Sequence, residues 1–442
     1  MKKSLIIALS MMLVLTFAFT GCGAGSGQAP AETEQGKTTD KPADKPAEQA
    51  SDKPVKFQLV NWGNPAHQEM LKSIVDSYKK DKPNVTIELV QASYGEFTEK
   101  VTSMIASGNP PDITWWSEDS FKYFADKGYF MELDDAIGQW GADWDKDDFY
   151  PNMMDEGKYN GKQYGIPFST PAHVLFYNKK LFDEAQIKYP DESWTWDDLV
   201  KATKTMTKGE GANKVYGITN LLDKGKEWQN LLDIMRPYGG SFMSDDRSKC
   251  TINSPENMKA LELYMDLLKG GYTTKPGANA PFEQGKAAMF LGYLSFNGAF
   301  EKAPGLDYDI AYLPKGPAGR LGRAGYANYV VMKTTKYPVE SLDFMKFITS
   351  KEMCKVQSKL FGPARKSVGL AADYMSDVAK PASKEIFIKS LEFCKPTENF
   401  PQFKNANTVA QEEFDKMFAE KQSIKDTVTN IEKRVNEIVG VK

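Results

Sequence analysis

Apolar and polar positions from Val55 onward follow two periods in turn, which predicts strands alternating with helices. Phe57 and Leu59 alternate with polar neighbours, and this period of two is typical of a strand. The strand is expected to end at Asn61–Trp62–Gly63, after which Asn64 can cap a helix and Pro65 can occupy its first turn. The apolar residues that share one face of this helix are Met70, Leu71, Ile74, Val75 and Tyr78.

The same alternation continues to residue 121. A strand is expected over residues 85–90, followed by a helix that ends at Gly108 and by a third strand, DITWW, from Asp112. The apolar face of the second helix carries Phe97, Val101, Met104 and Ile105. Units of this kind pair in parallel with right-handed crossovers, and such sheets bind ligands beyond the carboxyl ends of their strands. Trp62 and the segment 116–119 are expected at those ends, so we expect a binding site there.

Strand and helix patterns also alternate in the rest of the chain. Thr195 and Asp198 form a shortened capping box at the start of a helix. Strand patterning returns at DYDIAYLP, from Asp307, and at ANYVVM, and amphipathic helices are expected from Ala372 onward. The sequence of 442 residues is long enough for two domains, and the pattern predicts an α/β protein with two lobes.

The N-terminus carries a targeting signal. Lys2 and Lys3 precede an apolar run over residues 5–19, and the small pair Thr20–Gly21 precedes Cys22, so residues 1–21 are expected to be a secretion signal. The placement of Cys22 resembles a bacterial lipobox, which predicts that its thiol carries lipid. A plain signal peptide with an incidental cysteine is the alternative.

A polar tether is expected after the signal, over residues 22–54. Residues 23–54 contain no Val, Ile, Leu, Met, Phe, Trp or Tyr, so they cannot bury enough apolar surface to offset the entropy of ordering. A flexible coil of this length spans roughly 30 Å. That span is enough to hold a folded domain clear of a membrane.

The charge and the cysteines exclude several classes of function. A net charge of −3 gives no basic footprint for nucleic acid. Beyond Cys22 only Cys250, Cys354 and Cys394 remain, and we expect three buried thiols rather than a disulfide. Beyond the signal there is no run of about 18 apolar residues that could span a membrane.

Five segments in order indicate a family. They are PDITWWSEDSF, GIPFSTPAHVLFYNKKLF, WTWDDLVKA, GKAAMF and FMKFITSKE. Together they resemble the extracellular solute-binding proteins of ABC importers, in the carbohydrate-binding branch that includes the maltose-binding proteins. The resemblance implies a type II periplasmic-binding-protein-like fold, in which each lobe is an open, mostly parallel sheet flanked by helices and hinge crossings join the lobes. We expect a first lobe of residues 55–167 and 306–355, and a second of residues 168–305 and 356–442.

The resemblance also implies a set of ligand-binding residues. The family pattern Pro-Asp-x-x-x-Trp-x-x-Asp-x-Phe begins at Pro111, so Trp116 would form part of a sugar platform and Asp119 would accept sugar hydroxyls. Ser120 stands where the family often has arginine. The remaining positions that the resemblance implies are Glu96, Trp228, Tyr293, Phe296 and Arg365, and Trp62 joins them from its place at a strand end.

These residue types suit a sugar for a physical reason. A pyranose has an apolar face that an indole ring can cover, and its hydroxyl rim can donate to a carboxylate in bonds that each contribute about 1.5–3 kcal/mol net. Because neighbours in a strand face opposite ways, we assign packing to Trp115. We also assign packing to Trp194 and Trp196 and a core position to His173, and we leave Trp140 and Trp144 open between rim and core.

The resemblance predicts a receptor and not an enzyme. Its expected partners are a carbohydrate and the transmembrane subunits of an ABC permease, and it is expected to act as a monomer that a lipid anchors to the extracytoplasmic face of the cell membrane. No cofactor or metal is expected, because Asp148 replaces the glycine that a calcium loop from Asp143 would need.

Two rival functions stay open at this stage. A glycoside hydrolase could use Asp119 and Glu96 as its carboxyl pair. A binding protein for a polyamine or a peptide could use the acids and the aromatic rings through ion pairs and cation–π contacts.

Overall fold

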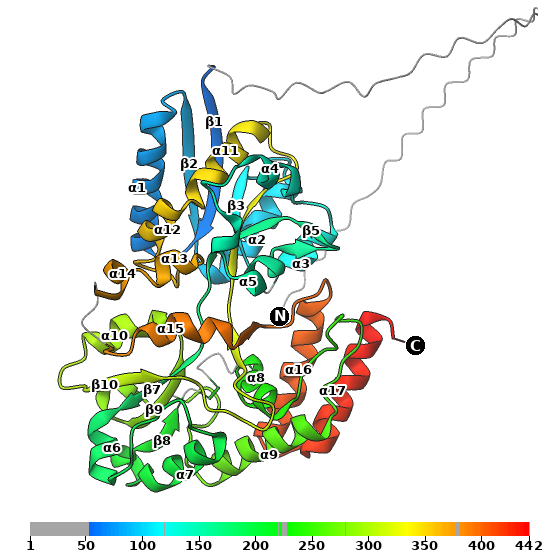
Figure 1. Ribbon diagram of the computed structural model, residues 1–442. Helices are drawn as coiled ribbons and strands as arrows, with labels where there is room; N and C mark the ends of the chain where they lie inside the picture. The colour runs from blue at the N-terminus through cyan, green and yellow to red at the C-terminus, as the bar shows by residue number, and fades with distance from the viewer. Residues whose placement is uncertain are drawn as a thin grey trace, which may run out of the picture. The chain divides into compact units, whose positions relative to one another are not determined.

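The computed structural model describes residues 53–441 except 119, 220, 223–227, 279 and 377–380. The predicted signal over residues 1–21, Cys22 and all of the tether up to residue 52 lie outside the described residues. Within the described part, the chain forms two lobes, each built on one sheet with helices packed against it (Figure 1). No helix of the described part is long and apolar enough to cross a bilayer.

The first sheet has the strand order β2-β1-β3-β12-β6. Its strands are β1 (Val55–Trp62), β2 (Val85–Ala92), β3 (Ile113–Ser117), β6 (Gly165–Ser169) and β12 (Ala327–Val331). The helices of this lobe are α1 (Pro65–Asp81), α2 (Tyr94–Ala106), α3 (Phe121–Asp126), α4 (Asp134–Gln139), α5 (Pro151–Glu156), α11 (Pro338–Ile348), α12 (Lys351–Gln357), α13 (Lys366–Gly369) and α14 (Ala372–Ser376). A short hairpin, β4 (Lys158–Tyr159) and β5 (Lys162–Gln163), lies beside them.

Local sequence explains where these elements begin. Asn64 Oδ1 accepts from the backbone N–H of Ala66 and of His67, and His67 Nδ1 accepts in return from the N–H of Asn64, so α1 starts where the cap predicted it. Four of the five predicted inward residues of α1, all except Val75, are buried. The capping box at Thr195 is also confirmed, with Asp198 closing it at the start of α7.

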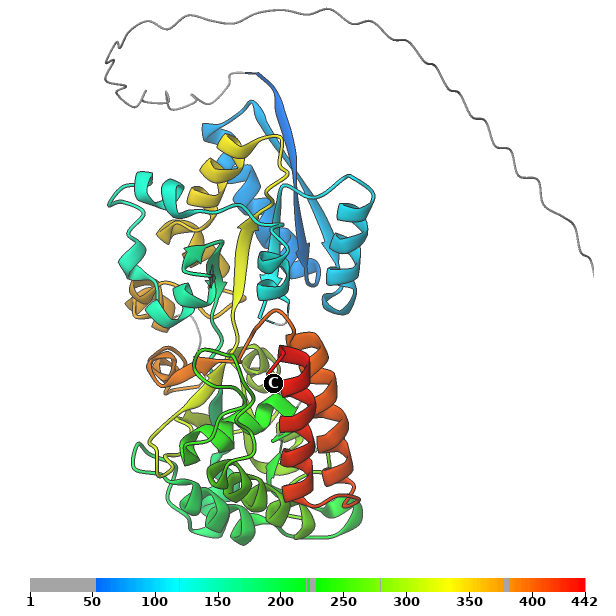
Figure 2. The same cartoon turned by 90° about the vertical axis from the view of Figure 1, so that its right-hand side faces the viewer.

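The second sheet has the order β10-β7-β9-β8. Its strands are β7 (Val174–Asn178), β8 (Tyr216–Thr219), β9 (Ala287–Gly292) and β10 (Tyr308–Ala311). The helices of this lobe are α6 (Lys179–Ala185), α7 (Trp196–Met206), α8 (Leu232–Met235), α9 (Pro255–Lys269), α10 (Asn297–Glu301), α15 (Glu385–Lys389), α16 (Phe403–Phe418) and α17 (Ile424–Val439). Helices α16 and α17 lie side by side as a pair (Figure 2).

The prediction of mostly parallel sheets is wrong, because both sheets are mixed. In the first sheet β1 runs parallel to β2 and β3, whereas β12 is antiparallel to both β3 and β6. In the second, only β8 and β9 are parallel. A strand that returns from the other lobe, such as β12, enters the sheet without the helical crossover that makes neighbours parallel.

The strand pairing also moves the predicted lobe boundaries. Strand β10, which we expected in the first lobe, pairs with β7 in the second sheet, and Ala364, expected in the second lobe, packs in the first-lobe core. The chain crosses between lobes at residues 170–173, between β6 and β7, and again at residues 325–326, between β11 (Gly322–Ala324) and β12. A third passage lies between Ala364 and Phe387, which packs in a second-lobe core.

Several single-residue predictions are decided by burial. Cys250, Cys354 and Cys394 are buried free thiols, as predicted. Trp194 and Trp196 are packing residues, as predicted. Trp140 and Trp144, which the sequence left open, belong to the first-lobe core.

Candidate functional site

The first lobe offers aromatic surface at the carboxyl ends of β1 and β2. Trp62 ends β1 and is only partly buried, and the ring of Tyr94, just after β2, lies 5.5 Å from it in an edge-on contact. Tyr94 is 55% exposed. Phe97 and Trp115 pack against Trp62 from behind, with ring centroids 4.9 and 5.2 Å away. The parallel pairing of β1 and β2 thus brings two apolar rings to one edge, where solvent can reach them.

Glu96 lies at the same edge, in the first turn of α2. Its carboxylate is exposed and accepts a hydrogen bond of 2.6 Å from Ser93 Oγ. An acid in the first turn is favoured by the positive end of the helix dipole. Glu96 therefore presents an exposed carboxylate at this edge of the first lobe, two residues after Tyr94.

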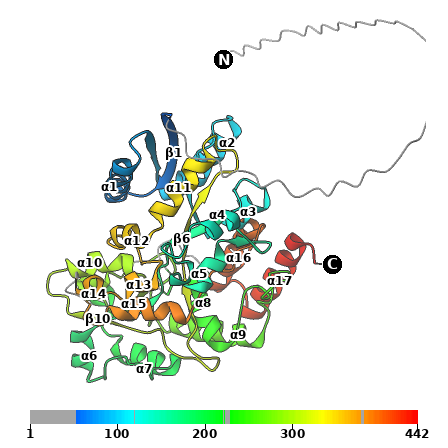
Figure 3. The same cartoon turned by 45° about the horizontal axis from the view of Figure 1, so that its top comes forward.

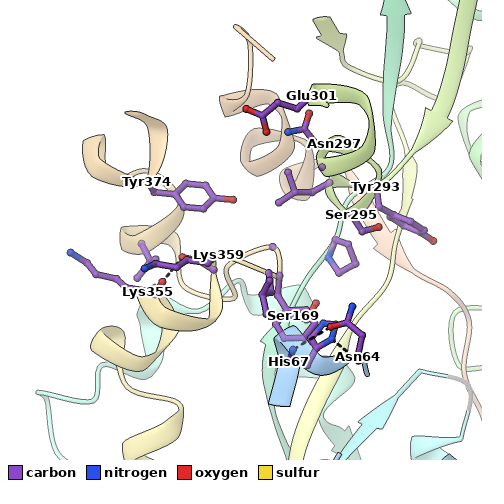
Figure 4. A pocket seen from close by; sticks show the side chains of 18 of the residues that line it. Asn64, His67, Ser169, Tyr293, Ser295, Asn297, Glu301, Lys355, Lys359 and Tyr374 are labelled. Carbon is purple, nitrogen blue, oxygen red and sulfur yellow. Dashed lines mark hydrogen bonds between the residues drawn. The ribbon is translucent and has the colours of Figure 1, made fainter. Parts of the chain in front are cut away.

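A cleft of about 760 Å³ lies between the start of α1 in the first lobe and the second lobe. Its first-lobe wall includes Asn64, His67, Lys355 and residues 358–362. Its second-lobe wall consists of Tyr293, Leu294, Ser295, Asn297, Gly298 and Glu301. Figure 4 shows Tyr374 and Lys355 on one side of this pocket and Tyr293 on the other. Helices α10 and α14 lie on the same flank of the molecule (Figure 3). The volume is in the range that holds a small organic ligand.

The charges of the cleft are balanced in sign. Glu301 and Asp373 are its acids, and Lys355 and Lys359 are its bases. Lys355 Nζ donates to Asp373 Oδ2 over 3.1 Å. Burial lowers the pKa of His67, which keeps its imidazole neutral near pH 7. The described walls therefore favour a ligand without a large net charge.

Tyr293, which the resemblance implies as a ligand-binding residue, forms part of the second-lobe wall. It directly follows β9 and caps the short 3-10 turn Leu294–Phe296. Phe296 lies in the same turn but packs on Phe290 and Phe300; it is absent from the described lining of the cleft. Of these two predicted residues, the structure brings only Tyr293 to the cleft.

The prediction that Trp116 forms an open platform is wrong. Trp116 is 0% exposed and packs against Phe97, Phe124 and Phe130. Trp115 is equally buried, on the side of Trp62 and His67. Packed side chains cover both faces of this central strand, so neither indole can reach a ligand in this conformation. Ser120 occupies the N-cap position of α3 without a side-chain cap hydrogen bond, and Asp119 lies outside the described residues.

Two more predicted contacts turn out to be packing residues. Trp228 is 0% exposed, lies among Phe242 and Phe414, and donates its Nε1–H to Asn407 Oδ1 over 2.7 Å. Its apolar neighbours come from segments distant in sequence, which the local pattern could not reveal.

Arg365 is the second of these corrections. It is 1% exposed and donates to the carbonyl oxygens of Trp144, Asp145 and Thr349. Burial lowers its pKa, and the nearby Asp148 opposes that shift. Through these hydrogen bonds Arg365, at the N-cap of α13, fastens the start of that helix to the rest of the first lobe.

His67, Asn64 and Tyr94 are candidate site residues that the sequence reasoning missed. Each lies within three residues of a strand end or helix cap at the predicted binding edge. Their position shortly after a strand could have indicated a place near a ligand site. The sequence pattern identifies Asn64 only as a helix cap, so the position of Asn64 in the cleft was not predicted. Among described residues there is no cluster of three or more metal-binding side chains.

Comparisons with known proteins agree with this architecture. A binding protein of Brucella abortus is 27% identical over 302 residues, which cover 64% of this chain and 68% of that protein. The diacetylchitobiose-binding protein DasA of Streptomyces coelicolor is 25% identical over 247 residues, 54% of each chain.

A solved structure shows the same fold. The ABC substrate-binding protein from Listeria monocytogenes in complex with cycloalternan superimposes with a TM-score of 0.77 at 24% identity, covering 88% of this chain and 100% of that chain. The two-lobed type II α/β fold is therefore confirmed. The sequence profile of the bacterial extracellular solute-binding proteins matches residues 29–353. By this match over most of its length, together with the two-lobed fold and the cleft between the lobes, the chain belongs to the bacterial extracellular solute-binding protein family.

Proposed function

We propose that this protein captures a mono- or oligosaccharide in the cleft between its lobes and delivers it to the permease of an ABC importer. The observation that supports the proposal is the aromatic residues on both cleft walls, Phe361 and Tyr374 in the first lobe and Tyr293 in the second. The rings of Trp62 and Tyr94 add accessible aromatic surface at the first-lobe sheet edge. Such rings can cover the apolar faces of a sugar, and Glu96 can accept hydrogen bonds from its hydroxyls.

The relatives support the same class of ligand. DasA is a diacetylchitobiose-binding protein, and the Listeria protein holds cycloalternan; both ligands are oligosaccharides. The family consists of binding proteins, so the protein is proposed to release its ligand unchanged.

A polyamine is a weaker candidate than a sugar. A polyamine site needs carboxylates in excess, whereas the described cleft walls carry as many lysines as acids. A phosphate ester would be expected at the N–H groups of a helix start, with basic side chains nearby. The residue after the cap of α1 is Pro65, which has no N–H to offer.

A thermal-shift screen tests the proposal. A ligand that binds only the folded state raises the free energy of unfolding, by about 2.7 kcal/mol at a ligand concentration of 100 Kd. The melting temperature must rise as a result. The panel should contain mono- and oligosaccharides, polyamines, peptides and phosphate esters. We expect shifts only among the saccharides. A shift with a polyamine or a peptide, and none across the saccharides, would replace the proposal.

The same proposal includes a lipid anchor at Cys22. The lipobox-like sequence and the polar tether support it. Metabolic labelling with a fatty acid should mark the wild-type protein and should disappear in Cys22→Ser. Equal labelling of both proteins would refute the anchor without affecting the ligand.

A further inference from the structure

A buried charged group lies beneath the second-lobe wall of the cleft, and the proposed function does not use it. Its members are His173, Asp233 and Arg323. His173 and Asp233 are 3% and 0% exposed. His173 Nδ1 contacts one carboxylate oxygen of Asp233, and the backbone N–H of Arg323 donates to the other over 2.6 Å. Both oxygens of this buried carboxylate are therefore engaged.

The three residues join separate segments of the chain. His173 lies in the crossing between β6 and β7, Arg323 lies on β11 just before the second crossing, and Asp233 lies on α8 of the second lobe. The N–H of His173 also donates to the carbonyl oxygen of Arg323 over 3.0 Å. Because a buried carboxylate is costly without its partners, Asp233 holds both crossings against α8.

This group reaches the cleft through Tyr293. The ring centroid of Tyr293 lies 3.8 Å from that of His173, with 48° between the planes. The guanidinium carbon of Arg323 lies 5.9 Å from the same ring. Arg323 is itself fixed, because its Nη1 donates to Asn230 Oδ1 over 2.5 Å and its Nε to Thr397 Oγ1 over 2.8 Å. Tyr293 thus rests on side chains that cannot move independently of the crossings.

We propose that His173, held in place by Asp233, is a positioning residue for Tyr293 and sets the orientation of this ring in the cleft. An aromatic ring that is already oriented loses less entropy when a ligand packs on it. Without the imidazole, the Tyr293 ring would have a gap beside it and more than one accessible rotamer. The expected effect of replacing His173 on ligand affinity rests on the proposed function, whereas the expected effect on the orientation of the Tyr293 ring does not.

Nitration tests the ring without any ligand. In His173→Gln the side-chain amide can still donate to Asp233, but the imidazole ring is gone. We expect tetranitromethane to nitrate Tyr293 at least threefold faster than in the wild type, as mapped by peptide mass spectrometry, with an unchanged rate at the exposed Tyr94. An unchanged Tyr293 rate would overturn the proposal.

A second variant separates the ring at position 173 from its contact with Asp233. His173→Phe keeps an aromatic ring beside Tyr293 but loses the contact with Asp233. Because Asp233 no longer holds this ring in place, we expect the nitration rate of Tyr293 to lie between those of the wild type and of His173→Gln. A Tyr293 rate in His173→Phe equal to the wild-type rate would show that Asp233 has no part in the positioning. Melting curves confirm that the variants compared are folded.

A double-mutant cycle then connects the ring to binding. With diacetylchitobiose and cycloalternan as probes, we expect His173→Gln to weaken affinity about tenfold alone and less than twofold in a Tyr293→Ala background. Equal losses in both backgrounds would mean that His173 does not act through Tyr293. If the wild type binds neither probe nor any other saccharide, the proposed function fails, and the nitration rates still decide the positioning role.

Discussion

At the scale of single residues, exposure determines which aromatic rings can meet a ligand. Trp62 and Tyr94 keep free surface at the end of parallel strands, whereas Trp116 and Trp228 have none. The same amino acid therefore has two roles in this protein. A partly exposed tryptophan at the edge of a sheet can contact a ligand, whereas a fully buried one stabilises the fold.

Substitution should separate these roles. Trp62→Ala is expected to weaken saccharide binding about tenfold, which corresponds to a loss of about 1.4 kcal/mol, and to cost less folding stability than Trp116→Ala, because Trp62 is only partly buried. Trp116→Ala should instead cost about 3–5 kcal/mol of folding stability, because it leaves a cavity in the core. Binding isotherms and urea unfolding of both variants measure the difference. If Trp116→Ala kept wild-type stability but lost saccharide binding, Trp116 would be a ligand-binding residue and not a packing residue.

The buried thiols allow a second test at this scale. Burial raises the pKa of Cys250 to about 12 and also raises the pKa of Cys354 and of Cys394. Only the thiolate reacts, so iodoacetamide at pH 8 should leave these residues unmodified in the folded protein. All of them should react in urea. Modification of the native protein at one of them would show that its surroundings open.

At the scale of elements, one carboxylate joins helices α16 and α17. Glu413, on α16, is 2% exposed and accepts hydrogen bonds from Lys416, Gln422 and Asn430 and from Arg434 on α17. Burial alone would raise its pKa, but these partners together lower it to about 2. The ionised form is therefore the one that stabilises the helix pair.

The pH dependence of this contact follows from the sign of the shift. The folded pKa is lower than the ordinary value of 4.5, so the stabilisation is complete above about pH 5 and is lost as the pH falls toward 2. Glu413→Gln should cost about 1.5–3 kcal/mol at pH 7 and much less near pH 2. Urea unfolding at both pH values measures this. A cost that does not change with pH would show that the charge is unimportant.

At the scale of the whole molecule, an ion pair connects the two lobes. Arg247, in the second lobe, donates to Glu156 at the end of α5 over 2.7 Å, and Lys122 of α3 lies 3.8 Å from the other carboxylate oxygen. Glu156 is 7% exposed. A buried carboxylate of this kind depends on its partners much more than a surface acid does.

Removing one partner should therefore be costly. Arg247→Ala is expected to lower stability by about 3 kcal/mol or more, because Glu156 would stay buried with Lys122 alone. Lys269→Ala is the matched control, since Lys269 and Glu420 form a surface pair in which both side chains are more than half exposed, and its cost should not exceed about 1 kcal/mol. Equal effects in urea unfolding would mean that the lobes do not depend on the Arg247 contact.

Local features of the fold were predictable from the sequence because they depend on near neighbours. The cap at Asn64 and the capping box at Thr195 use groups within three residues of each other. Strands β1, β2 and β3 carry their own period-two or apolar patterns. The family resemblance, which rests on motif order, gave the two lobes.

The sequence by itself thus determined the first elements of the chain, the class of fold and the sheet edge at which Trp62 lies. Only the tertiary structure decided that β12 enters the first sheet antiparallel, that Trp116, Trp228 and Arg365 are buried, and that His173 supports Tyr293. Those outcomes depend on packing between segments far apart in the chain. A short sequence pattern indicates which residues are apolar enough to be buried, but it does not indicate which distant side chains will pack against them.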